Sequence, residues 1–142
     1  MNKHGRLILF STLILVFLVT SGCSAPKPAG LTGQQIASVT ESTLQAMDAK
    51  DYPRFTRDFS DKMKSVFTQA QFDNLRTLLQ STSGSYVSLG TPDLTNNQGY
   101  AVYRIPARYT NETVYVTITF LVAGQKIEGL WFDSVALREA SQ

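Results

Sequence analysis

The spacing of hydrophobic residues changes once along the chain, near residue 85. Between Ile36 and Leu79, apolar side chains recur three and four positions apart, which is the period of a helix with one buried face. From Tyr86 onward apolar and polar side chains alternate, which is the period of a β-strand. The pattern therefore predicts a helical first part and a stranded second part.

Two capping boxes indicate where the longer helices begin. Thr32 is followed three positions later by Gln35, and Thr68 is followed in the same way by Gln71. In this motif the hydroxyl and the amide side chain satisfy backbone N–H groups that have no partner at a helix start. The first box predicts a helix that continues to about Lys50, and the second predicts another that ends before residue 85.

Two shorter helices are predicted between them. Pro53 suits a first helical turn, because proline has no N–H to lose there. Phe55 and Phe59 follow four positions apart, on one face. Ser60 can cap a further short helix that carries Met63. All these aromatic and apolar residues are expected in the core.

Four strands are predicted in the second part, with a turn at residues 96–99 and a tight hairpin at Gly124-Gln125. Their expected ranges are Tyr86–Leu89, Tyr100–Tyr109, Val114–Val122, and Lys126 to about Val135. Strict alternation along the last strand places Ile127, Trp131 and Asp133 on one face. Helices followed by an antiparallel meander predict an α+β domain, with the N-terminal helices packed on one face of a sheet of about four strands.

The first 22 residues have the composition of a signal peptide. Lys3 and Arg6 form a positive start, Leu7–Val19 is apolar, and small residues precede Cys23. The apolar stretch is short for a membrane-spanning helix, which needs about 20 apolar residues. We therefore expect residues 1–22 to be a cleaved signal; the alternatives are an uncleaved short anchor and an ordinary signal with an incidental cysteine.

The sequence around Cys23 resembles the bacterial lipobox, with Thr20 in place of the favoured leucine. The resemblance implies cleavage before Cys23, a diacylglycerol on its sulfur, and a fatty acid such as palmitate on the new amine. Two or three acyl chains hold a protein durably on a membrane. Residues 23–30 contain Pro26 and Pro28 and predict a tether, so that the folded domain, residues 31–142, faces outside the cytoplasm on a cell membrane or an outer membrane.

Composition excludes several functions. Of the 13 Lys and Arg residues, Lys3 and Arg6 lie in the leader, and the remaining eleven balance eleven acidic residues, without the basic excess of a nucleic-acid binder. The only histidine is His4 and the only cysteine is Cys23. The mature chain therefore lacks the residues for a Ser-His-Asp triad or a His/Cys zinc site. We expect no metal and no cofactor.

Two segments resemble nuclear transport factor 2-like domains. Segment 45–52 (Gln-Ala-Met-Asp-Ala-Lys-Asp-Tyr), with Phe55 and Phe59 after it, is similar to their opening helices, and segment 124–132 (Gly-Gln-Lys-Ile-Glu-Gly-Leu-Trp-Phe) to their final hairpin. More narrowly, the chain is similar to an uncharacterised bacterial subfamily often found as lipoproteins or beside α/β-hydrolase domains. The resemblance covers about residues 31–134. It implies a curved sheet wrapped around a cone-shaped cavity.

Enzymes of this superfamily that resemble ketosteroid isomerase use an aspartate base and a tyrosine or acid donor inside the cone. The residues of this chain that the resemblance offers for such a pocket are Tyr52, Tyr103, Arg104, Tyr115, Trp131 and Asp133. Burial in a pocket would raise the pKa of Asp133. For three of these residues a plainer interpretation is favoured: a surface carboxylate for Asp133, a solvent-facing strand for Arg104 together with Arg108, and a place between sheet and helices for Trp131.

Three functions remain. The leading hypothesis is a lipid-anchored, non-enzymatic domain that binds a small amphiphile or a protein partner; the second is an Asp/Tyr enzyme; the third is an assembly protein that forms homodimers through its exposed sheet. An enclosed pocket where Asp133 meets a tyrosine hydroxyl would favour the enzyme. A cone filled by side chains would favour binding or assembly.

Overall fold

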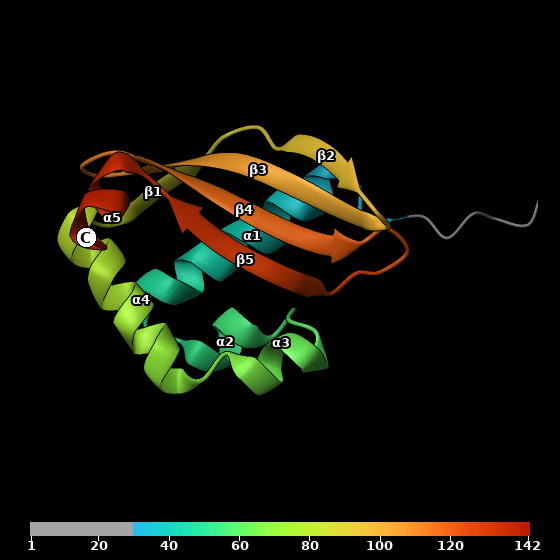
Figure 1. Ribbon diagram of the computed structural model, residues 1–142, viewed down its shortest axis with the longest axis horizontal. Coiled ribbons are helices and arrows are strands. Elements are labelled where there is room, and N and C mark those ends of the chain that lie inside the picture. The colour runs from blue at the N-terminus through green and yellow to red at the C-terminus, as the bar shows by residue number, and fades with distance from the viewer. Residues whose placement is uncertain (1–29) are drawn as a thin grey trace, which may run out of the picture.

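The computed structural model describes residues 30–142, so the predicted leader, Cys23 and most of the tether lie outside the described residues. Helices come first and strands follow, as the hydrophobic pattern predicts (Figure 1). The elements are α1 (Gly33–Asp48), α2 (Tyr52–Thr56), α3 (Asp61–Val66), α4 (Gln69–Thr82), β1 (Tyr86–Leu89), β2 (Asp93–Asn97), β3 (Tyr100–Tyr109), β4 (Thr113–Leu121), β5 (Ile127–Asp133) and α5 (Val135–Ala140).

The predicted helix starts are confirmed. Thr32 and Thr68 both form complete capping boxes, which begin α1 and α4. Pro53 lies in the first turn of α2, and the Ser60 hydroxyl accepts a hydrogen bond from the Met63 N–H at the start of α3. Each start is set by contacts between residues three apart, so neighbouring residues suffice to specify it.

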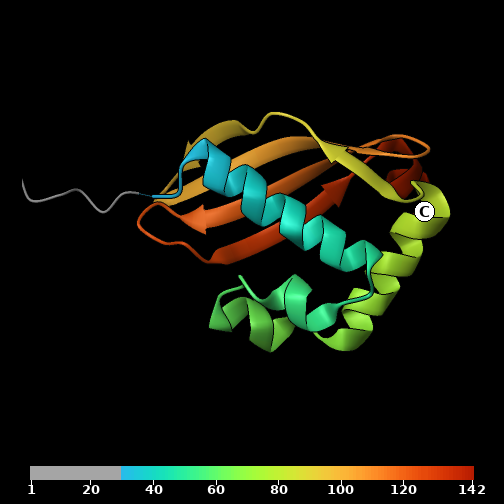
Figure 2. The same ribbon diagram turned by 180° about the vertical axis from the view of Figure 1, so that it is seen from behind.

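The strands form one antiparallel sheet in the order β1-β3-β4-β5, and β2 also pairs with β3. The long strand β3 thus has β1 along one half and β2 along the other, while β5 is the opposite edge. Helix α1 lies across one face of the sheet, and no described helix covers the other face (Figures 1 and 2). We call these the inner face and the outer face. The α+β class is confirmed.

Side chains fill the inner face of the sheet. On the sheet side Ile105, Val116 and Ile118 are completely buried, and the helices contribute equally buried residues such as Ile36 and Phe72. An aromatic cluster continues this core beneath α4. Its ring centroids lie 4.9 Å apart for Phe55 and Phe72, 5.1 Å for Phe55 and Phe59, and 5.5 Å for Phe55 and Phe67. In the described part of the chain, the buried core residues run from Ile36 to Leu137 and form one cluster.

The sheet has five strands where about four were predicted. Half of the segment expected to be a turn at residues 96–99 is the end of strand β2, and only Gln98 and Gly99 turn the chain. Both have positive φ, 44° and 88°. This is the backbone of a two-residue hairpin, whose twist matches that of the paired strands. Asp and Asn are poor strand formers, so β2 depends on its pairing with β3 and gave no local signal.

A β-bulge in β5 overturns the predicted faces of this strand. Thr119 pairs with Gly129, but Phe120 pairs with Ile127, so two residues of β5 lie opposite one of β4. The extra residue moves Ile127 to the inner face and turns Trp131 and Asp133 to the outer face. The prediction that Ile127 and Trp131 share a face is therefore wrong.

The expectation that Trp131 packs in the core is also wrong, because its side chain is 70 % exposed. The chain beyond β5 differs as well. Residues expected to extend the last strand to Val135 instead form α5, which Ser134 caps by accepting a hydrogen bond from the Leu137 N–H. Within residues 30–142, no helix is long and apolar enough to cross a membrane.

Candidate functional site

Three of the six predicted pocket residues meet on the outer face of the sheet. The Arg104 guanidinium carbon lies 3.6 Å from the centroid of the Tyr115 ring, a cation–π contact. The same guanidinium is 3.9 Å from a carboxylate oxygen of Asp133, and Nε of Arg138 is 3.5 Å from the other. Asp133 therefore lies between two cations, at a position where its side chain is 31 % exposed. The solvent-facing interpretation of Arg104 is confirmed.

The other two predicted tyrosines do not join this cluster. Tyr103 lies on the inner face, 8 % exposed, with its ring centroid 6.3 Å from that of Phe120. Tyr52 belongs to the helical layer, where its hydroxyl donates a 2.6 Å hydrogen bond to the Phe67 carbonyl. Tyr103 and Asp133 therefore lie on opposite faces of the sheet, and Tyr115, which pairs with Asp133, lies on the outer face, where it is 36 % exposed. No predicted tyrosine meets Asp133 inside the filled inner face.

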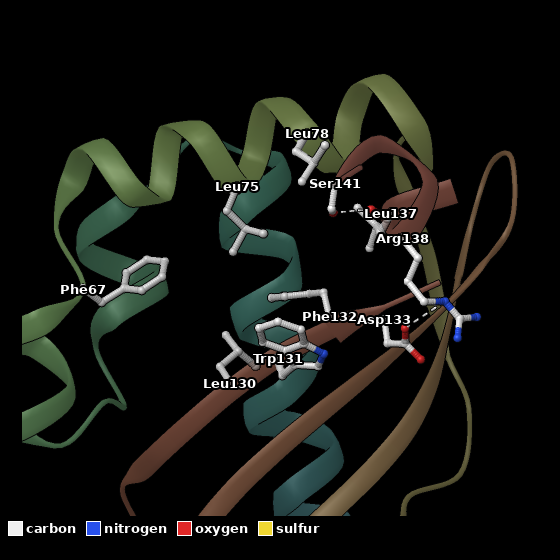
Figure 3. Close-up of a pocket in the computed structure, with 10 residues that line it drawn as sticks. All are labelled: Phe67, Leu75, Leu78, Leu130, Trp131, Phe132, Asp133, Leu137, Arg138 and Ser141. Atoms are coloured by element: carbon white, nitrogen blue, oxygen red, sulfur yellow. Dashed lines mark hydrogen bonds and ion pairs between the residues drawn. The ribbon is translucent and has the colours of Figure 1, made fainter. Parts of the chain in front are cut away.

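An apolar groove lies elsewhere, beside the free edge of β5. It encloses about 370 Å³ between β5, α4 and α5. Its walls consist mainly of apolar side chains, with an acidic and a basic residue at one end (Figure 3). The lining residues are Phe67, Leu75, Leu78, Leu130, Trp131, Phe132, Asp133, Leu137, Arg138 and Ser141.

The walls of the groove come from α4 and from the consecutive elements β5 and α5, which lie far from α4 in the sequence. Leu75 and Leu78 extend from α4 toward β5, and Leu130 and Phe132 approach from the strand (Figure 3). The Trp131 ring lies along the mouth, with its nitrogen on the side of Asp133 (Figure 3). A groove of this volume with few polar groups suits apolar or amphiphilic ligands. Of the predicted pocket residues, only Trp131 and Asp133 line it.

A partly buried carboxylate holds α5 in place as one wall of the groove. Glu112, in the hairpin between β3 and β4, accepts a 2.6 Å hydrogen bond from the Ser83 hydroxyl at the end of α4. The same oxygen accepts a 2.8 Å bond from the Ser134 hydroxyl, the cap of α5. Both serines are almost completely buried. Glu112 therefore joins the ends of α4 and α5 and fixes the spacing of the groove walls.

Sequence reasoning did not identify Glu112, the leucines of α4 as groove residues, or α5. The only sequence signal was at α5, where Ser134 stands three positions before Leu137 in the manner of a helix cap. The contacts of Glu112 span 22 and 29 positions, and no pattern within a short window reports such a pair.

A second polar cluster, where α1 meets β1, is structural. The Tyr86 hydroxyl donates to Glu41 over 3.4 Å, and its ring packs on Tyr109 with centroids 5.9 Å apart. Burial first, and then the Glu41 charge, raises the pKa of Tyr86 to about 12. Burial also raises the pKa of Tyr109, with Asp48 adding to the shift. Both phenols thus stay protonated and act only as donors at neutral pH.

In the described part of the chain, no three His, Cys, Asp or Glu side chains come together as a metal site would require. The groove has apolar walls and a charged end. Among the described residues that line it, no candidate nucleophile and base are in contact.

The family model with the description "Protein of unknown function (DUF3887)" matches residues 40–130. The chain belongs to this family. The matched residues of the DUF3887 domain run from within α1 to Leu130 in β5, so they include the α4 wall of the groove. Helix α5, which forms the other helical wall, comes after the matched residues in the sequence. No match is found among curated proteins.

Proposed function

We propose that this chain is a membrane-tethered, extracytoplasmic binding protein whose site is the groove between β5, α4 and α5. The observation that carries the proposal is the contrast between two regions of one core. Side chains fill the inner face of the sheet completely at Ile105 and Ile118, whereas the groove keeps about 370 Å³ free between apolar walls. Open apolar volume of this kind is characteristic of ligand sites.

The membrane tether rests on the sequence. The apolar run before Cys23 and the small residues next to it support export and lipidation. The order of the elements, helices packed on a curved antiparallel sheet, supports a place for this family within the nuclear transport factor 2-like superfamily. The binding domain is then held outside the cytoplasm.

The position of the groove agrees with this arrangement. Gly30 enters the domain at the end where the β2–β3 and β4–β5 hairpins lie, while α5 and the C-terminus lie at the opposite end (Figure 1). The groove is formed by the second half of β5 and by α5, so it lies toward the end remote from Gly30. A ligand would therefore approach from the side away from the tether.

A non-catalytic function has further support. The residues after the leader contain no histidine. The one carboxylate of the groove, Asp133, is paired with Arg104 and Arg138. Each of its two oxygens lies within 4.0 Å of a guanidinium nitrogen, and Tyr103 lies on the opposite face of the sheet. We therefore prefer binding to the Asp/Tyr enzyme.

The proposal can be tested by optical titration, because Trp131 is the only tryptophan of the chain and lies at the mouth of the groove. The probe is the amphiphilic dye anilinonaphthalene sulfonate, added to the protein from Gly30 onward. We expect saturable binding with energy transfer from Trp131 to the dye. Leu75→Gln, which places an amide in the groove wall, should weaken binding about tenfold.

The matched control is Leu94→Gln, since Leu94 is an exposed leucine on β2, outside the groove. It should leave the dye affinity within about twofold of the wild type. Equal affinities for the two variants, at equal stability, would show that the dye binds elsewhere. That result would contradict the groove as the binding site.

A further inference from the structure

We infer that the ligand of the groove is an extended polypeptide segment, which adds to the free edge of β5 as a further strand. This inference rests on the proposed function, since it names the class of ligand for the same groove. It is carried by the backbone N–H and C=O groups of β5, a feature of the groove that is separate from its apolar lining. In an antiparallel sheet the N–H and C=O groups of successive residues point alternately to the two neighbouring strands.

The direction of each backbone group in β5 follows from the hairpin between β3 and β4. The Tyr109 N–H donates to the Glu112 carbonyl over 2.9 Å, so this pair is hydrogen-bonded, and every second pair after it is too. Pro106 fits this alternation, because its carbonyl turns away from β4 and accepts from Gly90 over 2.7 Å. The residues of β4 that face β5 are therefore Tyr115, Thr117 and Thr119.

These three residues pair with Asp133, Trp131 and Gly129 in β5. The backbone groups of the residues between them, Leu130 and Phe132, must then point away from β4, toward the open edge. No hydrogen bond from the described residues reaches the N–H or C=O of either one. Both residues line the groove. The groove thus contains two unpaired donors and two unpaired acceptors, at the regular spacing of a strand.

The same edge already binds an extended segment of this chain. The residues before α3 form a parallel bridge with β5, in which the Ser60 N–H donates to the Ile127 carbonyl over 2.9 Å. The Ile127 N–H donates to the Asp58 carbonyl over 2.8 Å. This pairing stops at Ile127, and α5 turns away after Asp133. The edge is therefore closed at its start and open over Leu130 and Phe132.

A peptide satisfies this site better than an acyl chain does. An acyl chain could fill the apolar volume, but it has no groups that bond the edge of β5. A peptide strand supplies donors and acceptors at the required spacing, while alternate side chains enter the groove between Leu75 and Leu78. An uncovered strand edge is the feature that pairs with strands from other chains.

The charged end of the groove adds a preference for an acidic group. Nε of Arg138 contacts the Ser134 carbonyl at 3.1 Å and Asp133 at 3.5 Å. The two terminal nitrogens of this guanidinium bond no other described residue. With Arg104 also beside Asp133, two cations accompany one anion at this end. We therefore expect the bound segment to carry a carboxylate next to Arg138.

The test attaches a short β-strand to the protein through a linker, so that its effective concentration beside β5 is high. Ser141 lines the groove, so a Gly/Ser linker of about 12 residues after Gln142, spanning about 19 Å, can carry the strand Thr-Val-Thr-Val-Thr back to β5. The matched control carries Gly-Ser-Gly-Ser-Gly in its place. Hydrogen exchange of individual amides is then followed by NMR in both proteins.

The appended strand should slow exchange of the Leu130 and Phe132 amides at least about tenfold relative to the Gly/Ser control. The Trp131 amide should exchange equally in both proteins, because it already bonds β4. No slowing at Leu130 and Phe132 would overturn the inference. Slowing at β1 or β2 alone would overturn it as well, because the strand would then prefer the other edge.

A second comparison separates backbone pairing from side-chain contact. Leu130→Pro and Leu130→Ala both remove the leucine, but only the proline removes the outward N–H. An edge strand tolerates proline at such a position. In the strand-bearing protein, Leu130→Ala should keep the protection of the Phe132 amide and Leu130→Pro should lose most of it.

Equal protection in the two variants would refute pairing with β5. The dye titration distinguishes failure of the peptide inference from failure of the proposed function. Retained dye binding without strand protection leaves the groove as a small-molecule site, whereas loss of selective dye binding contradicts the groove itself.

Discussion

Glu112 provides the sharpest test of how the groove is built. One of its oxygens accepts from the Ser83 and Ser134 hydroxyls, both buried, and so connects α4 to α5. Replacement by alanine removes a charged acceptor from two buried donors. We expect Glu112→Ala to unfold more easily and to release α5 from α4.

The magnitude follows from the remaining partners. A hydrogen bond to a charged group contributes about 1.5–3 kcal/mol to stability. The Ser83 hydroxyl retains a contact of 3.3 Å with Thr82, and the Ser134 oxygen still accepts from the Leu137 N–H. The combined loss is therefore smaller than two full bonds, about 2–3 kcal/mol in the free energy of unfolding. Glu112→Gln keeps an acceptor and should lose about half as much.

Urea unfolding followed by circular dichroism and by Trp131 emission measures this difference. Glu139→Ala is the matched control, because Glu139 is an exposed residue of α5 and its side chain bonds none of the described residues. Hydrogen exchange should also quicken in α5 of Glu112→Ala and remain unchanged in β3. A Glu112→Ala protein within about 0.5 kcal/mol of Glu139→Ala would refute the role assigned to this carboxylate.

Three further predictions concern other parts of the chain. Cys23→Ser should move the protein from the membrane fraction to the soluble exported fraction, and continued retention on membranes would contradict lipidation. Phe55→Ala should reduce the free energy of unfolding by about 3–5 kcal/mol, because this completely buried ring contacts three others; a loss below about 1 kcal/mol in urea unfolding would contradict that packing. Since the pKa of Tyr86 is raised to about 12 in the folded protein, its contribution to stability is complete below pH ~10 and is lost as the pH rises toward 12. Tyr86→Phe should flatten this alkaline decline in thermal melts, and an unchanged profile would contradict the assignment.

The features that the sequence predicts correctly are those that depend on nearby residues. Thr32 and Thr68 cap helices through contacts three positions away, and alternation along β4 places Val114 and Val116 in the core. These interactions lie within one turn or one strand, so a short window of sequence contains them. The α+β class follows from their order along the chain.

The features that the sequence misses depend on distant pairing. The bulge opposite Phe120 reverses the faces of β5, and with it the positions expected for Trp131 and Ile127. The groove requires α4, β5 and α5 to come together, and Glu112 holds the last of these through residues 22 and 29 positions away. Candidate residues chosen by type alone were therefore divided between the two faces of the sheet.

The register of β5 with β4 also determines where the chain can change length. One residue more or less at the Gly124-Gln125 turn alters only a surface loop, which proteins tolerate well. Deletion of Leu130, between the bulge and Trp131, would instead shift the register by one residue, so that Trp131 would point inward and Phe132 outward. Natural variation in length is therefore expected at the turn and not within the strand. A change of one residue in the length of β5 thus decides whether the indole of Trp131 lies at the mouth of the groove or in the core.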